Sequence, residues 1–433
     1  MARTPATEHA HDVRRLSPLR DFLRTESAGA VLLAVGALAA LVWANSPWSA
    51  SYESLWSSRV AVTVAGHSLD LDLRHWVNDG LMTMFFLVVG LEIKRELTHG
   101  HLADRRAALL PGLAAVGGMV VPALVYLAVA GSTEPRGWAI PVATDIALAV
   151  GVLSVAGSRV PPSLRAFLLG LAIVDDIGAI VIIAAVYSTG VSFGWLAVAV
   201  AGVVVAVVVR RIGVRSVPAY VVVGSFVWLG LYQAGVHPTL AGVVMGVLAP
   251  ATPLERADLV DRDDVAAGHV ADDVEAVRAA SQRMKGTVSV VEWLQHVLHP
   301  WTGYVIVPVF ALANSGIHLS VDGLRDAAGS PITWGVFLGL LLGKPLGIML
   351  ATGGAVRADL ADRPAGAMPR QLLGVGSAAG IGFTVAIFIT KLALPDATDQ
   401  SNAKLAILLA SVLAALASSA LLLARSGGRP AEG

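Results

Sequence analysis

The sequence predicts an all-α, polytopic membrane protein with twelve transmembrane helices, and three observations lead to this fold class. The 433 residues are 55% hydrophobic and only 14% charged, and their mean hydropathy is +0.70. A soluble domain carries more charge than this to cover its surface. The apolar residues form twelve long runs, and the basic residues concentrate in alternate connections between these runs. The chain therefore needs lipid around it.

The twelve apolar runs are bounded by charged or turn residues. A hydrocarbon core about 30 Å thick needs about 20 helical residues, which is the length that most of the runs approach. The eighth run is short, and its boundary with the seventh is weakly marked. The predicted spans are Ser27 to Asn45, Val77 to Glu96, Ala107 to Ala130, Trp138 to Val155, Leu164 to Tyr187, Val191 to Val209, Val217 to Leu231, Gly235 to Val247, Trp301 to Ile317, Ile332 to Thr352, Leu372 to Leu392 and Ala403 to Leu423.

Basic residues predict how the chain is oriented in the membrane. Twelve spans put both termini on one side, and 24 of the 31 lysines and arginines lie on that side. Six lie in the opposite connections, and Lys344 lies inside a span. This bias predicts that both termini are cytoplasmic.

The polar ends of the chain, residues 1–26 and 425–433, are predicted to be cytoplasmic tails. The first apolar run is too long for the core of a signal peptide and lacks a convincing cleavage site, so we expect a retained helix. Spans one to eight then occupy residues 27–249, and spans nine to twelve occupy residues 299–424.

The first external connection predicts a β-hairpin at about residues 58–75. Apolar residues alternate on both sides of the turn Ala65-Gly66-His67-Ser68, and a period of two is typical of strands. An exposed hairpin invites pairing with a second copy of the chain. The alternating residues are Val60, Val62 and Val64 before the turn, and Leu69, Leu71 and Leu73 after it.

Residues 250–298 are predicted to form a cytoplasmic acidic linker followed by an amphipathic segment. The stretch is rich in aspartate and arginine, which is typical of a solvated, partly disordered linker with some helix. We assign it no chemistry. Its acidic residues include Asp261, Asp263, Asp264, Asp272 and Asp273.

The composition excludes several classes of chemistry. The chain has no cysteine, which rules out disulfides, thiol catalysis and cysteine-ligated zinc or iron–sulfur sites. Its 31 basic and 31 acidic residues balance, so net charge suggests no nucleic-acid partner. We expect no cofactor.

Four ionisable residues stand out inside the predicted spans: Asp145, Asp175, Asp176 and Lys344. A charged group at this depth costs about 2.5 kcal/mol or more on insertion scales. Asp175 and Asp176 are neighbours near the middle of the fifth span, and neighbouring side chains on a helix diverge by about 100°. The structural alternative is a pair of buried acids satisfied by hydrogen bonds. We expect a functional pair, because intramembrane charges mark ion pathways.

Two adjacent carboxylates in a low dielectric repel each other, so one of them should keep its proton until a cation arrives. Sodium and lithium are hard cations that prefer several oxygen ligands. The side chains of Asp175, Asp176 and Thr144, with freed backbone carbonyls, would supply these ligands. Cation binding would release protons and protonation would expel the cation, so the pattern predicts cation–proton exchange.

Two spans contain residues that interrupt a helix near the middle of the membrane. Pro141 removes a helical hydrogen bond just before Thr144 and Asp145, and the eleventh span contains the glycine-rich segment 374–384. Discontinuous helices in corresponding halves point to a binding site, because their ends carry partial charges. We expect Asp145 to offset facing helix N-termini and Lys344 to offset facing C-termini. For either segment alone, a proline kink or packing glycines is an equal alternative.

Lys344 is one of only five lysines beside 26 arginines. A buried amine can release its proton and a guanidinium cannot, so a lysine here suits pairing with Asp175 or carriage of a proton. The alternative is a side chain that extends to the interface from a helix end. Its central position argues against that alternative.

Seven sequence blocks in order resemble the NhaA sodium/proton antiporters, and together they extend over nearly the whole chain, from about Arg20 to Leu423. The blocks are Val89-Gly-Leu-Glu-Ile-Lys-Arg-Glu-Leu, Ala143-Thr-Asp-Ile-Ala, Ala172-Ile-Val-Asp-Asp-Ile-Gly-Ala-Ile, Gly235-Val-His-Pro-Thr-Leu-Ala-Gly, Val297-Leu-His-Pro-Trp, Gly343-Lys-Pro-Leu-Gly-Ile and Gly380-Ile-Gly-Phe-Thr.

The resemblance implies a fold and a cellular setting. Spans three to five and ten to twelve would form inverted repeats, with discontinuous helices that cross at spans four and eleven. The external hairpin would match the dimerisation element of the family, so a homodimer in a bacterial plasma membrane is implied.

The resemblance also implies electrogenic export of sodium or lithium in exchange for more than one proton. Asp175 and Asp176 match the ion-binding pair of the family, Thr144 and Asp145 the supporting site, and Lys344 the buried lysine.

A cytoplasmic pH sensor is the third implication of the resemblance. Histidine is the side chain whose ordinary pKa lies near neutrality, although a lone histidine at a helix end is often a polar cap. The family usually has a glutamate where this chain has Gln295, and Glu292, about one turn earlier, could substitute for it. The matching sensor positions are Glu92, Lys94, Arg95, Glu96 and His237, with Glu292 added.

Two other classes of function fit the sequence less well. An intramembrane aspartyl protease would need a Gly-x-Gly-Asp segment, which the sequence lacks. A sodium-coupled symporter on a related scaffold is the closer rival. Sodium sites of symporters need no proton-releasing carboxylate pair, so Asp175 and Asp176 favour exchange.

Overall fold

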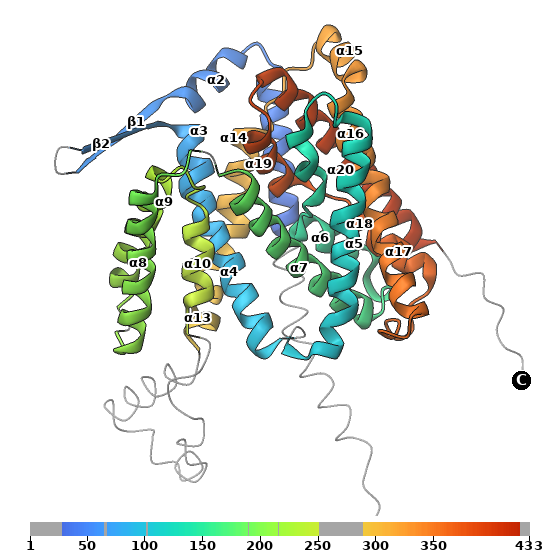
Figure 1. Ribbon diagram of the computed structural model, residues 1–433. Helices are drawn as coiled ribbons and strands as arrows, with labels where there is room; N and C mark the ends of the chain where they lie inside the picture. Colours follow the sequence, from blue (N-terminus) through green and yellow to red (C-terminus); the bar gives the residue numbers. More distant parts are fainter. Residues whose placement is uncertain are drawn as a thin grey trace, which may run out of the picture. The chain divides into compact units, whose positions relative to one another are not determined.

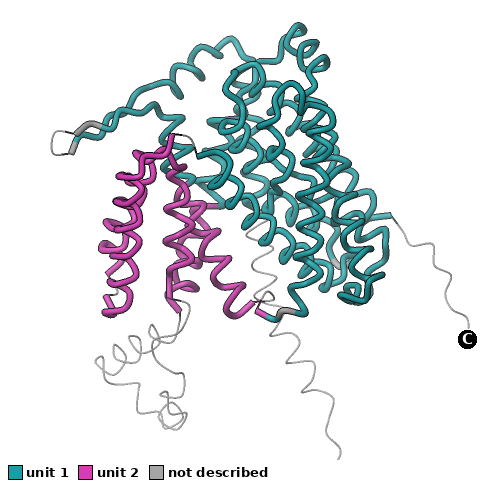
Figure 2. Tube along the Cα trace, viewed as in Figure 1, with its two compact units in different colours: residues 1–82, 104–188, 303–433 teal, residues 83–103, 189–302 magenta. Residues whose placement is uncertain are grey.

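The computed structural model describes residues 28–64, 67–100, 103–188, 190–214, 216–250 and 289–424, and these residues are mostly helical (Figure 1). The chain divides into two compact units (Figure 2). Unit 1 holds residues 1–82, 104–188 and 303–433, and unit 2 holds residues 83–103 and 189–302. Both predicted tails and the core of the predicted linker, residues 251–288, lie outside the described residues.

Unit 1 contains the β-hairpin and most of the helices. Its strands and α-helices are the helix Ala28–Ala44, α2 (Ser49–Ser57), β1 (Arg59–Val64), β2 (His67–Asp72), α3 (Leu73–His75), α5 (Arg105–Ala130), α6 (Ile146–Ala156), α7 (Pro162–Val186), α14 (Val307–Asn314), α15 (Val321–Gly329), α16 (Pro331–Leu338), α17 (Lys344–Arg357), α18 (Pro369–Ala379), α19 (Phe383–Ala393) and α20 (Ala397–Leu423). Its other helical elements are the π-helical turns Trp76–Leu81 and Gly339–Gly343 and the 3-10 helices Pro135–Val142 and Gly157–Arg159.

Unit 2 contains α4 (Met82–His99), α8 (Phe193–Arg211), α9 (Val217–Gln233), α10 (Leu240–Leu248) and α13 (Val290–Trp301). The π-helical turn Thr302–Ile306 continues α13 toward α14. Several helices of both units begin at a residue whose side chain caps them. The side chains of Asp104, Ser289 and Asp396, for example, accept backbone N–H groups from the first turns of α5, α13 and α20.

The membrane class is confirmed, and the number of spans stays a prediction. Among the described residues, eight helical segments are long and apolar enough to cross a membrane: Leu73–His99, Arg106–Ala130, Pro135–Ala156, Pro162–Val186, Phe193–Arg211, Val290–Asn314, Pro331–Arg357 and Ala397–Leu423. Two bent pairs raise the number to as many as ten, Ala28–Ala44 with Ser49–Ser57 and Pro369–Ala379 with Phe383–Ala393. The predicted seventh and eighth spans correspond to the shorter helices α9 and α10.

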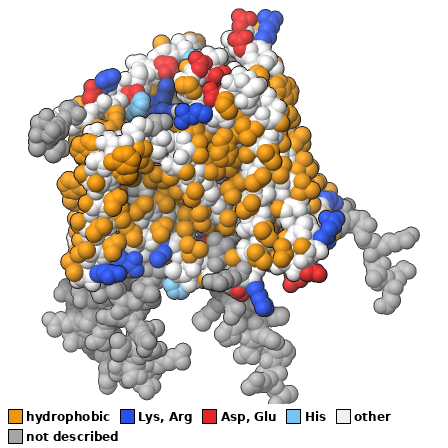
Figure 3. Space-filling model, in the orientation of Figure 1, with side chains coloured by type: hydrophobic (Ala, Val, Ile, Leu, Met, Phe, Trp, Pro, Cys, Tyr) orange, Lys and Arg blue, Asp and Glu red, His pale blue; other side chains and the backbone are white. Residues whose placement is uncertain are grey.

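Apolar side chains remain exposed along the sides of the long helices, as lipid contact requires. Figure 3 shows hydrophobic side chains covering the helix flanks on one face, with charged groups gathered at the ends. Helix α20 is an example, because its outward residues are large and apolar. They include Leu409, Val412, Leu413 and Leu416.

The predicted hairpin is confirmed. Strands β1 and β2 pair antiparallel, with Arg59 opposite Asp72 and Val64 opposite His67. The Asp72 side chain then accepts the His75 backbone N–H at 2.7 Å and so caps α3. This cap turns the second strand directly into the helical segment Leu73–His99.

Both predicted helix interruptions are present in unit 1. The 3-10 helix Pro135–Val142 ends before an extended stretch, and α6 starts again at Ile146. Helices α18 and α19 are bent by 46° at their break. The two breaks touch, because the Asp145 N–H donates to the Ile381 carbonyl at 2.6 Å.

Helices in each unit approach closely at glycine. In unit 1 a Cβ atom on Gly347 of α17 would lie 2.1 Å from the Gly117 carbonyl oxygen of α5. In unit 2 a Cβ on Gly242 of α10 would lie 2.1 Å from the Thr83 carbonyl oxygen of α4. Small residues at such contacts let backbones pack directly, which is a common basis of helix association in lipid.

We predict that Gly347→Ala destabilises unit 1, because the added methyl group meets backbone that has to move. Overpacking of this kind costs about 1–3 kcal/mol. The matched control is Gly354→Ala on the same helix, where a Cβ meets nothing within 4 Å. Thermal unfolding in detergent should show a lower melting temperature for Gly347→Ala and an unchanged or higher one for the control. Equal melting temperatures would show that the backbones of α5 and α17 are not in close contact at Gly347.

Candidate functional site

The adjacent carboxylates lie on α7, which packs on α5 through small residues. A Cβ on Gly170 would lie 3.2 Å from the Pro111 side chain, and one on Gly178 would lie 2.3 Å from Met119 Sδ. Between these two glycines, Asp175 is 0% exposed and Asp176 is 7% exposed. The helix therefore holds both acids within the packed interior of unit 1.

Asp175 pairs with the lysine that the sequence singled out. Lys344 Nζ lies 2.7 Å from Asp175 Oδ2, and both side chains are fully buried. The same ammonium group donates to the Val142 carbonyl at the end of the first interrupted segment. Asp176 also acts electrostatically on Lys344. Lys344 thus faces two acids and the C-terminal end of a short helix, where a cation is favoured.

Asp145 occupies the N-terminal ends of both restarted helices. Its Oδ1 accepts the Leu148 N–H of α6 at 3.0 Å, and its Oδ2 accepts the Thr384 N–H of α19 at 3.0 Å. These N–H groups have no partner within their own helices, and a carboxylate is favoured at a helix N-terminus. The side chain therefore holds the two breaks together.

Thr144 lies beside Asp145 in the first break. Its hydroxyl donates to the Ala379 carbonyl at the end of α18, at 2.9 Å, and the residue is a close neighbour of the Asp175 carboxyl group. The structure therefore brings together the residues predicted as the ion site, which come from α7, α17 and the two interrupted segments.

The site has more acids than bases. Lys344 pairs with Asp175 and two helix N-termini compensate Asp145, so an ionised Asp176 adds a further negative charge to a buried place. Accumulated negative charge in a buried place is unfavourable. The arrangement therefore favours added protons or a small cation.

The predicted pH-sensing residues lie in unit 2. Four of them, Glu92, Lys94, Arg95 and Glu96, are on α4, and His237 precedes α10, with its Nδ1 2.8 Å from the Thr239 hydroxyl. Leu91 of α4 packs with Ala249 and with Val291 of α13, so these helices meet.

The two candidate residues of α13 have opposite surroundings. Glu292 is exposed in the first turn, whereas Gln295 is 7% exposed and its Oε1 accepts no hydrogen bond from the described residues. The buried position in this helix therefore carries an amide, and the nearby carboxylate faces outward.

The sequence pattern gave no reason to single out three other ionisable residues that lie within candidate spans, Asp79, Lys391 and Lys404. Each stood within three residues of the end of a predicted span, where a charge needs no explanation. The helical segments of Asp79 and Lys404 extend beyond those ends, to Leu73 and Ala397, so these two charges lie deeper, whereas Lys391 stays in the last turn of α19. The caps Asp72 and Asp396 are the sequence signal that would have placed the helix starts correctly.

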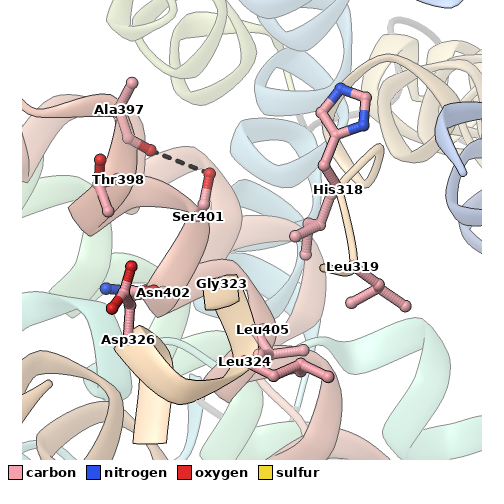
Figure 4. A pocket seen from close by; sticks show the side chains of 11 residues that line it. His318, Leu319, Gly323, Leu324, Asp326, Ala397, Thr398, Ser401, Asn402 and Leu405 are labelled. Atoms are coloured by element: carbon pink, nitrogen blue, oxygen red, sulfur yellow. Dashed lines mark hydrogen bonds between the residues drawn. The ribbon is translucent and has the colours of Figure 1, made fainter. Parts of the chain in front are cut away.

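A cavity of about 250 Å³ opens in unit 1 beside α15 and the first turns of α20 (Figure 4). Its lining does not include the residues of the carboxylate site, so it is not the predicted cation site. It is lined by Ile317, His318, Leu319, Gly323, Leu324, Asp326, Ala397, Thr398, Ser401, Asn402 and Leu405.

Comparison with known proteins matches almost the whole chain. The family model described as Na+/H+ antiporter 1 matches residues 20–422. The chain is 46% identical to the Na(+)/H(+) antiporter NhaA 2 of Sorangium cellulosum, over 96% of this chain and 91% of that protein. It is 45% identical to the NhaA 3 antiporter of Frankia alni, over 93% and 88%. It is 46% identical to the NhaA antiporter of an Acidovorax species, over 90% and 88%.

These matches confirm the resemblance that the seven sequence blocks carry. They cover both the carboxylate site in unit 1 and the helices of unit 2. The chain therefore belongs to the Na+/H+ antiporter 1 family, whose members are membrane transporters and not enzymes.

Proposed function

We propose that this protein exports sodium or lithium in exchange for more than one proton, and that Asp175 and Asp176 carry the exchange. The observation that supports this most directly is the buried Asp175–Lys344 pair with a second carboxylate beside it, where two interrupted helices meet. Protons and the cation compete for the same oxygens in this proposal, so both cannot be bound at once.

The cation is substrate, and its ligands would be oxygens of this chain. Asp175 and Asp176 would supply carboxylate oxygens, and Thr144 would supply its hydroxyl. The carbonyls of Val142 and Ala379 at the two breaks are already hydrogen-bonded, to Lys344 and Thr144. A bound cation would therefore rearrange these bonds, and in this way the site is coupled to the interrupted helices.

Lys344 would act as the resident counter-charge. While Asp175 is ionised and no cation is bound, the ammonium group neutralises it at 2.7 Å. An arriving cation would weaken this pair, and a buried amine can release its proton in a way that a guanidinium cannot. This makes Lys344 a carrier of one of the exchanged protons in our proposal. The protein needs no cofactor for such an exchange.

The finer architecture belongs to the same proposal. Twelve spans in two inverted repeats would let the interrupted helices cross at the ion site, with both termini cytoplasmic in a bacterial plasma membrane. The hairpin β1–β2 would then be external. Its exposed strand residues, Val60 and Val62 among them, would pair with a second copy to form a homodimer. Alternating access to the two sides would follow from movement of the helices around the site.

The exchange is tested in everted vesicles with an imposed pH gradient. Wild-type protein should collapse the gradient when sodium or lithium is added. Asp176→Asn should reduce the response to background, because an amide carries no negative charge to attract the cation and exchanges no proton. Asp322→Asn is the matched control, since that carboxylate is exposed and paired with Arg325. A wild type without response between pH 6 and 9 contradicts the proposal, and so does an active Asp176→Asn. Sodium uptake without proton movement would identify a symporter.

The buried pair predicts a specific pattern of stability. Lys344→Ala leaves Asp175 buried without its partner, which costs about 3–5 kcal/mol. The double variant Asp175→Asn, Lys344→Ala removes both charges and should unfold at a higher temperature than Lys344→Ala alone. Thermal unfolding of the four proteins in detergent gives the coupling energy as a double-mutant cycle. Additive effects would mean that the two charges do not depend on each other.

The pH sensor is tested at Gln295. We expect Gln295→Glu to shift the pH at which transport activates while the maximal rate is kept, because it puts a titratable group at the buried position of α13. Gln233→Glu, at the exposed end of α9, is the control and should leave the profile unchanged. Transport rate measured against pH decides the matter. An unshifted profile for Gln295→Glu would remove this position from the sensor.

A further inference from the structure

The cavity beside α15 and the start of α20 has no role in the carboxylate site. Its volume is about 250 Å³, which leaves room for several water molecules or for a small organic molecule. Asn45 fixes one rim of this cavity, because its side chain donates to the Ile317 carbonyl at 2.7 Å and accepts the Leu319 N–H at 2.6 Å. The chain after Asn45 leads through α2 into the hairpin, so the cavity lies at the hairpin end of unit 1 (Figure 1).

Hydrogen bonds at both ends hold α15 in place beside the cavity. The Ser320 hydroxyl accepts the Gly323 N–H at 2.9 Å and so caps the start of the helix. At the other end, the Trp334 indole N–H of α16 donates to the Ala328 carbonyl at 2.9 Å. Helix α20 supplies the other wall through one face of its first turns, at residues 397, 398, 401, 402 and 405. Two fixed helices therefore form the cavity.

Two polar side chains in the lining have no partner in the described part of the chain. Asn402 of α20 is only 7% exposed, and its side-chain amide makes no hydrogen bond with the described residues. A buried amide in this state is normally satisfied by water or by a ligand. Asp326 of α15 is exposed and forms no ion pair with those residues. The two helices thus present an amide and a carboxylate to one cavity (Figure 4).

The charges around the cavity favour a cation. Its lining contains neither lysine nor arginine, and its ionisable side chains are Asp326 and His318. Asp326 stands in the last turn of α15, where the helix end is itself partly negative. The N-terminal end of α20 is partly positive, but the Asp396 carboxylate already accepts two of its first N–H groups. An anion would therefore find no free positive group at the start of α20.

The basic side chains nearest in sequence do not neutralise Asp326. Arg325 is its neighbour on α15 and pairs with Asp322 at 3.3 Å. Lys404 follows Asn402 by two residues, which places it about 200° around the axis of α20, and it does not line the cavity. The carboxylate therefore lacks a counter-charge from these two side chains, and a cationic ligand would supply one.

The apolar part of the lining selects the kind of cation. Leu319, Leu324 and Leu405 line the cavity together with the polar groups. A hard metal ion prefers several oxygen ligands, and the described residues contain no group of three or more histidine or acidic side chains that could hold one. An ammonium group on a short apolar body suits both parts of the lining. A phosphatidylethanolamine headgroup suits it less well, because it would bring a phosphate toward Asp326.

We propose that this cavity binds a small organic cation, a free primary amine with a short apolar body. The ammonium group pairs with Asp326 and donates to the side-chain oxygen of Asn402, and the apolar body lies against the three leucines. The amine enters from the hairpin side, because Asp326 is exposed there. The carboxylate pair of α7 does not line the cavity, so this inference does not depend on the proposed exchange.

The test uses para-fluorobenzylamine, whose fluorine NMR signal reports binding to the full chain in phosphatidylcholine nanodiscs, relative to empty nanodiscs. The uncharged para-fluorobenzyl alcohol has a similar shape and should bind about tenfold more weakly, the loss typical of one charge-assisted contact. Asp326→Asn should raise the dissociation constant of the amine by about tenfold. Asn402→Leu should also weaken binding, without a lower melting temperature, because its amide has no hydrogen bond to lose among the described residues.

The matched control is Asp322→Asn, which lies on the same helix outside the cavity and should leave the dissociation constant unchanged. No binding of the amine to the wild type, equal binding of amine and alcohol, or full binding by Asp326→Asn overturns the proposal. If Asn402→Leu does not fold, Asp326→Asn alone decides, because that side chain is exposed. A free amine should bind equally in nanodiscs that contain phosphatidylethanolamine. Weaker binding there would contradict a free amine and assign the ammonium group to a lipid headgroup.

Discussion

The ion pair between Asp175 and Lys344 is the interaction on which the interior of unit 1 depends. Two opposite charges with no exposure must meet at hydrogen-bond distance, because either one alone is strongly unfavourable in a membrane interior. For the Asp175 and Lys344 side chains to lie 2.7 Å apart, α7 and α17 must both pack against α5 close to each other. The close backbone contact at Gly347 supplies this approach for α17, since a larger residue there would meet the Gly117 carbonyl of α5.

The interrupted helices solve a second electrostatic problem. A break exposes N–H groups on one side and carbonyl groups on the other, and these cannot remain unsatisfied in lipid. Asp145 accepts N–H groups from α6 and α19, and Lys344 donates to the Val142 carbonyl before the first break. The Thr144 hydroxyl donates a hydrogen bond to the Ala379 carbonyl. The charged residues therefore stabilise the breaks and remain close to the Asp175 carboxyl group.

The features that follow from local residue patterns could be predicted from the sequence. The features that depend on where each helix begins and ends could not. Apolar runs placed the helices, alternation placed the hairpin, and Pro141 marked the first break. The depth of Asp79 was missed because its apolar run starts at Val77, whereas the helical segment starts at Leu73. Helix α9 ends at Gln233 because Gly235 takes a left-handed φ of 74°, and α10 begins only at Leu240. The opposite burial of Glu292 and Gln295 depends on which face of α13 packs, which a single sequence does not display.

The balance of charge determines what the carboxylate site favours. Lys344 compensates Asp175 at 2.7 Å, and the N–H groups at two helix starts compensate Asp145. Asp176 is buried beside this pair, and it adds a further negative charge when it is ionised. A proton or a small cation would offset that charge, so in the proposed exchange one replaces the other.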